Sequence, residues 1–360
     1  MANKVSKISR ASLTNYATYL FVVAAYIILI ILSKTGGLNS KMTGMLVPIT
    51  AYVVMAISLN LVVGIMGELS LGHAGFMAIG AFCGTTATMA LVNAVPNDTI
   101  RLFIGLLVGA IFGGIFGFLI GIPVLRLNGD YLAIVTLAFG EIIKSIFANV
   151  YAGVKNGHLA FSMLENKLNL GDGDRIIIEG AMGIRSIPRI STFTIGFILI
   201  MICLAVVFNM VKSRTGRAIM ALRDNRIAAE SVGIPAFRFK IIAFTISAAM
   251  AGAAGALFGN NYSSLVSTKF NIDTSILILV FVVLGGQGNM LGSIIAAAAL
   301  TILPEALRSF ADYRMLTYAI ILILVMLIKN NPEINYFFTR IFKKAKKKAK
   351  KAMQEKEAAK

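Results

Sequence analysis

The stretch YVVMAISLNLVVGIMGELSLGHAGFMAIGAF, residues 52–82, decides how this chain folds. Two apolar runs are separated only by GELSLGH, which contains a glutamate, a serine and one of the two histidines of the chain. A helix needs roughly 20 mostly apolar residues to cross the hydrocarbon core of a bilayer. The stretch and its flanking residues therefore predict two membrane helices with a polar break between them.

The composition of the whole chain agrees with this prediction. Of the 360 residues, 58% are hydrophobic and 14% are charged, and the mean hydropathy is +0.82. Ordinary globular domains are about 45–50% apolar and about 25% charged. We therefore predict an all-α polytopic membrane protein with about ten transmembrane or partial helices, or eight on an alternative count. The predicted spans cover residues 16–33, 44–66, 69–92, 100–125, 130–150, 191–211, 239–260, 274–285, 288–304 and 314–330.

One of these runs is too short to cross a bilayer alone. It covers residues 274–285, and the sequence GGQGNMLG at residues 285–292 separates it from the next run. In transporters, glycine-interrupted helices occur where the backbone is buried in protein or lines a cavity. We therefore expect a broken or partial helix at this place.

The net charge of +18 is concentrated in three segments. Residues 1–16 contribute +3, residues 212–240 contribute +5 and residues 340–360 contribute +8. Ten spans place all three segments on one side of the membrane, which the positive-inside rule identifies as the cytoplasm. The predicted organisation is a cytoplasmic N-terminus at 1–15, a transmembrane domain at 16–330 with an extracytoplasmic loop at 151–190 and a cytoplasmic loop at 212–238, and a basic cytoplasmic tail at 331–360.

The lysine-rich tail is expected to contact anionic membrane lipid rather than nucleic acid, because it has no interleaved aromatic residues. Catalytic motifs are absent from the sequence. No G-x-x-x-x-G-K-[ST] occurs, so the chain has no P-loop for nucleotide hydrolysis. His73 and His158 lie in unrelated settings, and Cys83 and Cys203 lie in apolar runs without zinc spacing. We predict a protein that is not an enzyme and that has no cofactor and no metal.

The predicted cytoplasmic loop, SRTGRAIMALRDNRIAAESVGIPAFRFK at residues 213–240, is patterned like two short helices. Small and apolar residues recur at helical spacing. Asp224 and Asn225 can end one helix and cap the next, and Gly233 followed by Pro235 can end the second. Such helices can dock into a groove of another protein or lie on the lipid surface as amphipathic helices.

Four separated motifs of this chain together resemble the permease subunits of branched-chain amino acid ABC importers, of the LivM type rather than the LivH type. The resemblance covers residues 45–330 approximately. The motifs are GELSLGHAGFMAIGAF, LNGDYLAIVTLAFGEII, SRTGRAIMALRDNRIAAESVGI and VVLGGQGNMLGSIIAAAAL. The resemblance implies an ABC importer permease fold in the cell membrane of a prokaryote, with leucine, isoleucine or valine as the amino-acid substrate. It also implies a second, LivH-like permease subunit, two ABC ATPase subunits that hydrolyse ATP, and an extracytoplasmic solute-binding protein.

The resemblance further implies that the cytoplasmic loop docks on an ATPase subunit, as the Glu-Ala-Ala-x-x-x-Gly loop of ABC permeases does. Ala228, Ala229 and Gly233 keep this spacing, but Ile227 stands where the family has glutamate. The polar contact of that glutamate is therefore not carried over. The candidate coupling residues are Gly216, Arg217, Ala221, Arg223, Asp224, Asn225, Ala228, Ala229 and Gly233.

Polar and small residues within apolar runs are candidates for the translocation path. A charge at the centre of a bilayer costs at least ~2.5–3.5 kcal/mol, so such a residue usually faces the bundle interior or water. The alternative is close helix packing at the glycines, with Glu68 at the water boundary and His73 hydrogen-bonded to a neighbouring helix. The path candidates are Glu68, Ser70, Gly72, His73, Gly75, Gly285, Gly286 and Gln287.

Other functions remain open from the sequence alone. An ion-coupled secondary transporter would use Glu68, Asp130 and Glu141 as coupling residues, but it gives no reason for a docking loop. A passive channel is a further alternative, and related ABC permeases carry urea or short amides. Glu141 and Lys144 can instead pair along one helix face, and Asp130 can cap the entry to that helix.

Overall fold

The computed structural model describes residues 2–35, 40–127, 129–155, 158–163, 175–307, 319–320 and 323. The chain divides into two compact units, Met1–Thr301 and Ile302–Lys360, and the first holds the features discussed below. The predicted span 314–330 lies outside the described residues except for residues 319–320 and 323, and the basic tail lies wholly outside them.

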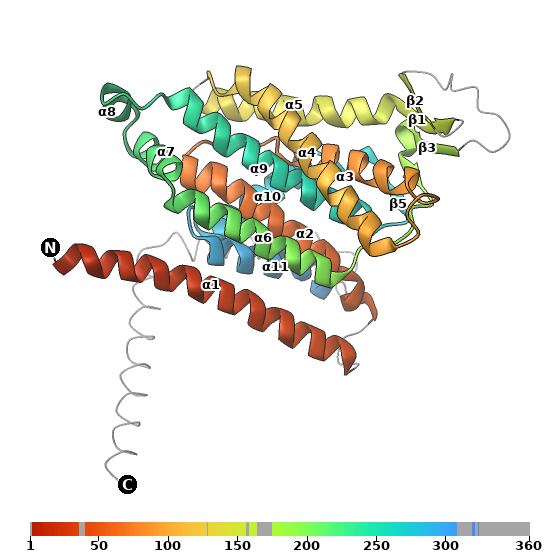
Figure 1. Ribbon diagram of the computed structural model, residues 1–360, viewed down its shortest axis with the longest axis horizontal. Helices are drawn as coiled ribbons and strands as arrows, with labels where there is room; N and C mark the ends of the chain where they lie inside the picture. Colours follow the sequence, from red (N-terminus) through yellow and green to blue (C-terminus); the bar gives the residue numbers. More distant parts are fainter. Residues whose placement is uncertain are drawn as a thin grey trace, which may run out of the picture. The chain divides into compact units, whose positions relative to one another are not determined.

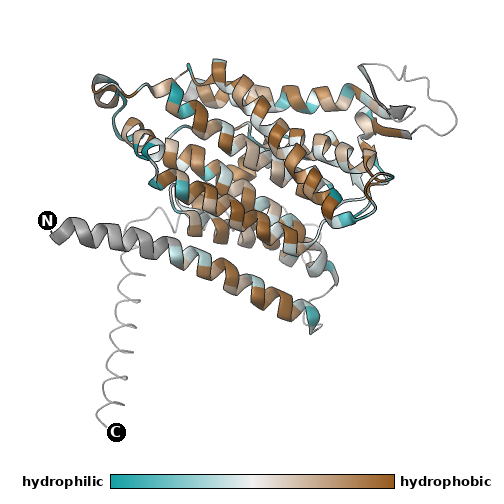
Figure 2. Cartoon of the chain, viewed as in Figure 1, coloured by the Kyte–Doolittle hydropathy of each residue, from teal (hydrophilic) through white to brown (hydrophobic). Residues whose placement is uncertain are grey.

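The other nine predicted spans are helices, so the mostly helical architecture is confirmed (Figure 1). Six of the described helices are long and apolar enough to cross a membrane. Figure 2 shows hydrophobic residues along the helices and hydrophilic ones near their ends. The helices of the spans are α1 Ala2–Lys34, α2 Ser40–Asn60 with its continuation η1 Leu61–Met66, α3 His73–Ala90, α4 Asp98–Val124, α5 Asp130–Asn149, α6 Phe193–Lys212, α9 Ala236–Gly259, α10 Ile272–Gly285 and α11 Met290–Ala306.

Close packing of glycine-rich helices forms the core. Helix α4 has buried glycines at every fourth position from Gly105 to Gly121, and α9 presents small residues to them. A Cβ added to Gly252 of α9 would lie only 2.2 Å from the Gly109 carbonyl oxygen of α4. Small residues allow such approach between membrane helices, where van der Waals packing drives association. Helix α9 packs against α2, α3 and α4, and it is largely buried, as is α2.

The loop at residues 151–190 contains strands that the sequence reasoning did not predict. Together with one strand that follows α9, they form a five-stranded sheet in the order β2-β1-β3-β4-β5, in which all pairs are antiparallel. The last strand follows α9, so the sheet joins two loops that are distant in sequence. The strands are β1 Val150–Lys155, β2 His158–Met163, β3 Arg175–Glu179, β4 Ile184–Arg185 and β5 Ser264–Leu265. Short 3-10 turns, η2 Gly180–Met182 and η3 Ser267–Phe270, lie beside them.

The loop between α6 and α9 forms two short helices, α7 Arg214–Asp224 and α8 Arg226–Ser231, as predicted. The Asn225 side chain accepts a hydrogen bond from the Ala228 amide at 3.0 Å and so caps α8. Gly233, with a φ of +84°, ends the second helix in the left-handed region that favours glycine. On α5, which begins at Asp130, Glu141 and Lys144 form the expected ion pair.

Candidate functional site

The polar break between α2 and α3 is built around a buried ion pair. Helix α2 continues as the π-helix η1, which ends at Gly67 with a φ of +80°. Glu68 follows and pairs with Lys240, whose side chain comes from the first turns of α9. The side chains are only 13% and 8% exposed, respectively. Sequence reasoning singled out Glu68 but missed Lys240, which lies 172 residues further along the chain.

His73, the first residue of α3, is buried and joins α3 to α2 and α9. Its Nε2 lies 2.6 Å from Ser58 Oγ and 3.3 Å from Ser247 Oγ. The Ser58 hydroxyl donates to the Ser247 carbonyl at 2.8 Å, and the Ser247 hydroxyl donates to the Ser58 carbonyl at 2.7 Å. His73, Ser58 and Ser247 thus form one buried polar cluster that links α3, α2 and α9.

Two polar atoms of this region are buried without a hydrogen-bond partner among the described residues, namely His73 Nδ1 and Ser70 Oγ. Buried polar atoms are nearly always hydrogen-bonded, and each exception calls for an explanation. Both atoms therefore have unused hydrogen-bonding capacity at the break between α2 and α3.

The glycines of the break are packed against α5. A Cβ on Gly72 would lie 2.0 Å from the Thr136 carbonyl oxygen, and one on Gly75 would lie 3.0 Å from Gly140 Cα. The Leu71 amide also donates to Thr136 Oγ1 at 3.0 Å. These contacts correspond to the packing alternative that the sequence left open for the glycines.

The second group of path candidates forms the turn between α10 and α11. Gly285 lies against the backbone of α11, where an added Cβ would be 2.3 Å from the Ser293 amide nitrogen. Gly286 has a φ of +99°, and Gln287 is exposed. The two helices have 14 and 17 residues, so the broken helix is confirmed.

Asn60, which sequence reasoning missed, connects this turn to η1. Its Oδ1 accepts a hydrogen bond from the Gly288 amide at 2.8 Å, and its Nδ2 donates to Ser293 Oγ at 2.9 Å. The only signal in the sequence was an asparagine within an apolar run, where an unpaired amide would be costly. One buried side chain thus joins the start of η1 to the turn between α10 and α11.

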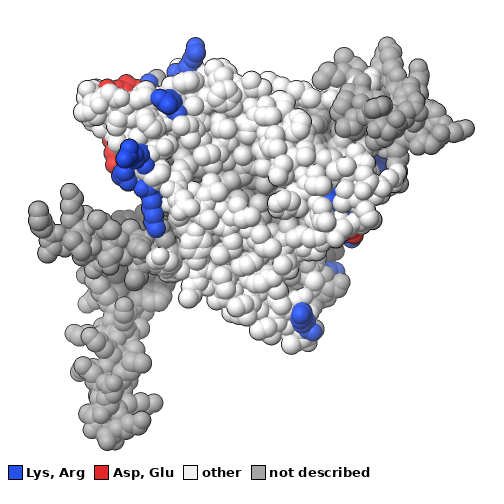
Figure 3. Space-filling model, viewed as in Figure 1, with Lys and Arg blue, Asp and Glu red and all other residues white. Residues whose placement is uncertain are grey.

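The α7–α8 loop exposes apolar side chains. Ile227 is 82% exposed and Val232 is 75% exposed, although the loop has its own small core of Leu222, Ala229 and Ala236. Figure 3 shows Lys and Arg side chains gathered at the end of the molecule where α7 lies, beside a broad surface without charge.

The predicted coupling residues have different roles in this loop. Gly216 allows the tight turn after α6, because a Cβ there would lie 2.2 Å from the Met210 carbonyl oxygen. Arg217 donates to the Lys212 carbonyl at 2.9 Å. Arg223, whose side chain is 38% exposed, extends from α7 to η1, where its Nη1 donates to the Gly64 carbonyl at 2.9 Å. Ala221, Asp224 and Ala228 are exposed.

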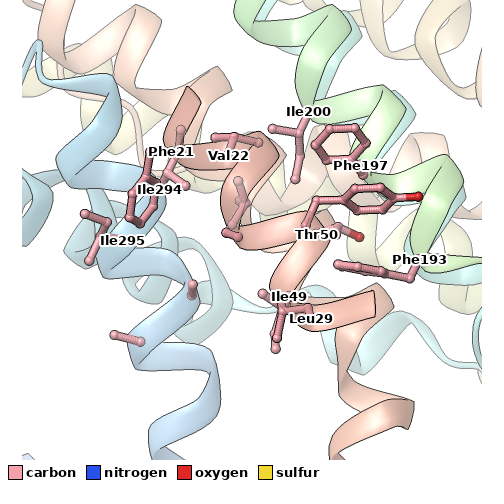
Figure 4. A pocket seen from close by; sticks show the side chains of 15 residues that line it. Phe21, Val22, Leu29, Ile49, Thr50, Phe193, Phe197, Ile200, Ile294 and Ile295 are labelled. Carbon is pink, nitrogen blue, oxygen red and sulfur yellow. The ribbon is translucent and has the colours of Figure 1, made fainter. Parts of the chain in front are cut away.

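Two cavities lie apart from these groups. An apolar cavity of about 310 Å³ lies between α1, α2, α6 and α11, with Thr50 among its lining residues (Figure 4). A second cavity of about 280 Å³ lies at the sheet, beside Glu179 and Arg185. Neither is lined by a path candidate.

Comparison with known proteins gives a consistent result. Residues 41–328 match the protein family described as "Branched-chain amino acid transport system / permease component". The chain is 36% identical to the high-affinity branched-chain amino acid transport system permease protein LivM of Salmonella typhimurium strain LT2, over 77% of this chain and 66% of that protein. It is 34% identical to LivM of Escherichia coli strain K12 over the same shares, and 26% identical to LivH of Salmonella typhimurium over 78% of this chain and 89% of LivH. The match therefore spans 66%, just under two thirds, of the length of the LivM proteins.

Proposed function

Because this multi-pass membrane protein belongs to the family of branched-chain amino acid transport system permease components, we propose that it is the LivM-type subunit of an ATP-driven importer of leucine, isoleucine and valine. It forms half of the translocation path. A second, LivH-like permease subunit forms the other half, two ABC ATPases power the cycle, and an extracytoplasmic solute-binding protein delivers the amino acid.

The observation that carries this proposal is the α7–α8 loop. Ile227 and Val232 are large apolar side chains that stand out from a loop rich in charge. Apolar anchors on a polar surface are typical of protein interfaces. The small core of Leu222, Ala229 and Ala236 holds α8 in place, so its exposed face is preorganised for a partner. The excess of Lys and Arg supports a cytoplasmic position for this loop, on the side of the membrane where we propose that the ATPases bind.

The lining of the path is expected at the polar break and at the α10–α11 turn. A branched-chain amino acid has two charged ends and an apolar side chain. Small residues, a few polar atoms and apolar walls let such a solute pass without tight binding, and the solute-binding protein supplies the selection. His73 Nδ1 and Ser70 Oγ are the polar atoms that have bonding capacity to offer.

The buried pair of Glu68 with Lys240 gives no support to an ion-coupled secondary transporter. A coupling carboxylate must bind and release its ion during each cycle, whereas this carboxylate is neutralised by a lysine of the same chain.

The docking surface can be tested by placing a charge on it. We expect Ile227→Asp to reduce the amount of ATPase that co-purifies with the permease, because burying an unpaired carboxylate in an interface is costly. Glu230→Gln, on the same helix α8, is the matched control. Normal recovery of the ATPases with Ile227→Asp would exclude this face of α8 from the interface.

A further inference from the structure

Three groups, from Arg223, Asn60 and Gly288, lie close to Gly64 in the middle of the π-helix η1. Arg223 donates to its carbonyl oxygen at 2.9 Å from the side of α7. On the other side, a Cβ added to Gly64 would lie 2.0 Å from Asn60 Oδ1 and 2.1 Å from the Gly288 amide nitrogen. The α7–α8 loop, η1 and the α10–α11 turn therefore meet at a residue that cannot carry a side chain.

The Arg223 side chain makes contacts along its whole length, from its aliphatic stem to its guanidinium group. Its stem lies over Gly67, where an added Cβ would be 2.5 Å from Arg223 Cγ. Its Nε and Nη2 donate to Asp224 Oδ1 at 3.1 and 2.9 Å. The guanidinium is thus anchored on its own helix and on the core at the same time. A residue whose only role was to dock on an ATPase would not need the second anchor.

The element that Arg223 contacts, η1, is a π-helix, which differs from an α-helix in its winding. A π-helix closes its hydrogen bonds five residues apart, holds one residue more per turn than an α-helix, and often occurs at functional sites. Conversion of η1 to an α-helix would shift the following residues by one position, a rotation of about 100° at 3.6 residues per turn. Those following residues include Glu68 and Ser70.

The other end of η1 is tied to the α10–α11 turn. Asn60, which precedes η1, bonds to the Gly288 amide and to the Ser293 hydroxyl. Asn60 is fully buried. Gly64, inside η1, also lies against the Gly288 backbone, where an added Cβ would be 2.1 Å from the Gly288 amide nitrogen, so a change in the winding of η1 would alter its packing against this turn.

We propose that Arg223 and Asn60 are positioning residues of a relay, in which movement of α7 is passed through η1 to the α10–α11 turn. This inference rests on the proposed function, because it assigns to the ATPase the force that moves α7. In this proposal Ile227 and Val232 bind the ATPase, whereas Arg223 transmits the displacement of α7 to η1. Contiguous packed elements with two discrete arrangements are the physical basis for such coupling.

The experiment uses the complete transporter, with its ATPases and binding protein, in proteoliposomes. The probe is Gln287→Cys in a background with Cys83→Ala and Cys203→Ala, labelled with a small water-soluble thiol reagent. In the parent, the labelling rate should change about fivefold or more when ATP hydrolysis is trapped, the lower end of typical coupling factors.

In Arg223→Ala and in Asn60→Ala, this change should fall to less than about twofold, with ATP hydrolysis retained and leucine uptake per ATP reduced about fivefold or more. The double variant should be no worse than either single variant, because both break the same relay. Arg223→Lys, which keeps a donor for the Gly64 carbonyl, should restore part of the response. Arg238→Ala is the control, since this arginine is exposed near the start of α9.

The outcomes separate the relay from the proposed function. A parent complex without ATPases would refute both. A coupled parent with an unchanged labelling response in Arg223→Ala would refute the relay alone. Loss of the ATPases from the Arg223→Ala complex would show that Arg223 docks and does not transmit, and additive effects in the double variant would show that the two residues act separately.

Discussion

The ion pair between Glu68 and Lys240 should contribute strongly to the stability of the helix core. We consider Glu68→Gln, which preserves the shape of the side chain and removes its charge. The ammonium group of Lys240, whose side chain is 8% exposed, would then be buried without a counter-charge. Removing one partner of a buried ion pair typically costs about 3–5 kcal/mol. In chains of 150–250 residues, 1 kcal/mol shifts Tm by about 2–4 °C, so we expect Tm to fall by about 5 °C or more.

Unfolding of the detergent-purified permease can be followed with a dye that fluoresces on reaction with thiols. The chain provides its own reporters, because Cys203 is buried in α6 and Cys83 is partly buried in α3. The double variant Glu68→Gln/Lys240→Met should recover most of the lost Tm, since replacing both partners of a buried pair by neutral groups is often neutral or stabilising.

A control comes from the ion pair of Arg226 and Glu230 on α8. Its side chains are 44% and 43% exposed, and such helical surface pairs contribute only about 0.2–0.5 kcal/mol. Glu230→Ala should therefore lower Tm by less than about 2 °C. The reasoning is refuted if Glu68→Gln unfolds at the parent temperature, or if the double variant is less stable than either single variant.

Two further predictions concern packing and capping. Gly252→Ala would place a Cβ 2.2 Å from the Gly109 carbonyl oxygen, so α4 and α9 must separate at a cost of about 1–3 kcal/mol. The control Gly114→Ala, whose added Cβ has its nearest contact at 3.4 Å, should leave Tm unchanged or raise it. Equal Tm values for the two variants would contradict the close packing of α4 and α9. Asn225→Ala removes the cap of α8 and should destabilise that helix by about 1 kcal/mol. The expected result is faster proteolytic cleavage in the α7–α8 loop at an unchanged global Tm. An unchanged cleavage rate would show that the Asn225 cap does not stabilise α8.

The positions of the helices followed from hydropathy because the bilayer sets their length, and nine of the ten predicted spans lie in the described residues as helices. The α7 and α8 helices followed from local signals, namely Asn225 as a cap and Gly233 as a stop. The sheet was not predicted, because its strands are short and β5 comes from a loop that follows α9. The three consecutive isoleucines of β3, residues 176–178, were a local strand signal that the sequence analysis did not use.

The candidate site was predictable in part. Glu68 and His73 attract attention because a charge and an imidazole are rare in apolar runs. Their partners could not be identified from the sequence, because Lys240 is one of several basic residues of the predicted cytoplasmic loop and Ser58 is one small residue within a helix. The π-helix could not be foreseen either, since its one-residue excess leaves the apolar pattern of residues 52–66 unchanged. Tertiary packing, which brings α2, α7, α9 and α11 together, decides these contacts.

The most direct test of the proposed importer is the energy source of uptake. The chain, isolated by an affinity tag from its native membrane and reconstituted with its co-purifying partners and a solute-binding protein, should take up labelled leucine only when ATP is supplied on the side of the α7–α8 loop. Two ATPase subunits and a second permease should be present in the active fraction, and collapsing the ion gradients should leave uptake unchanged. Uptake by this chain alone, driven by a proton or sodium gradient and indifferent to ATP, would contradict the account.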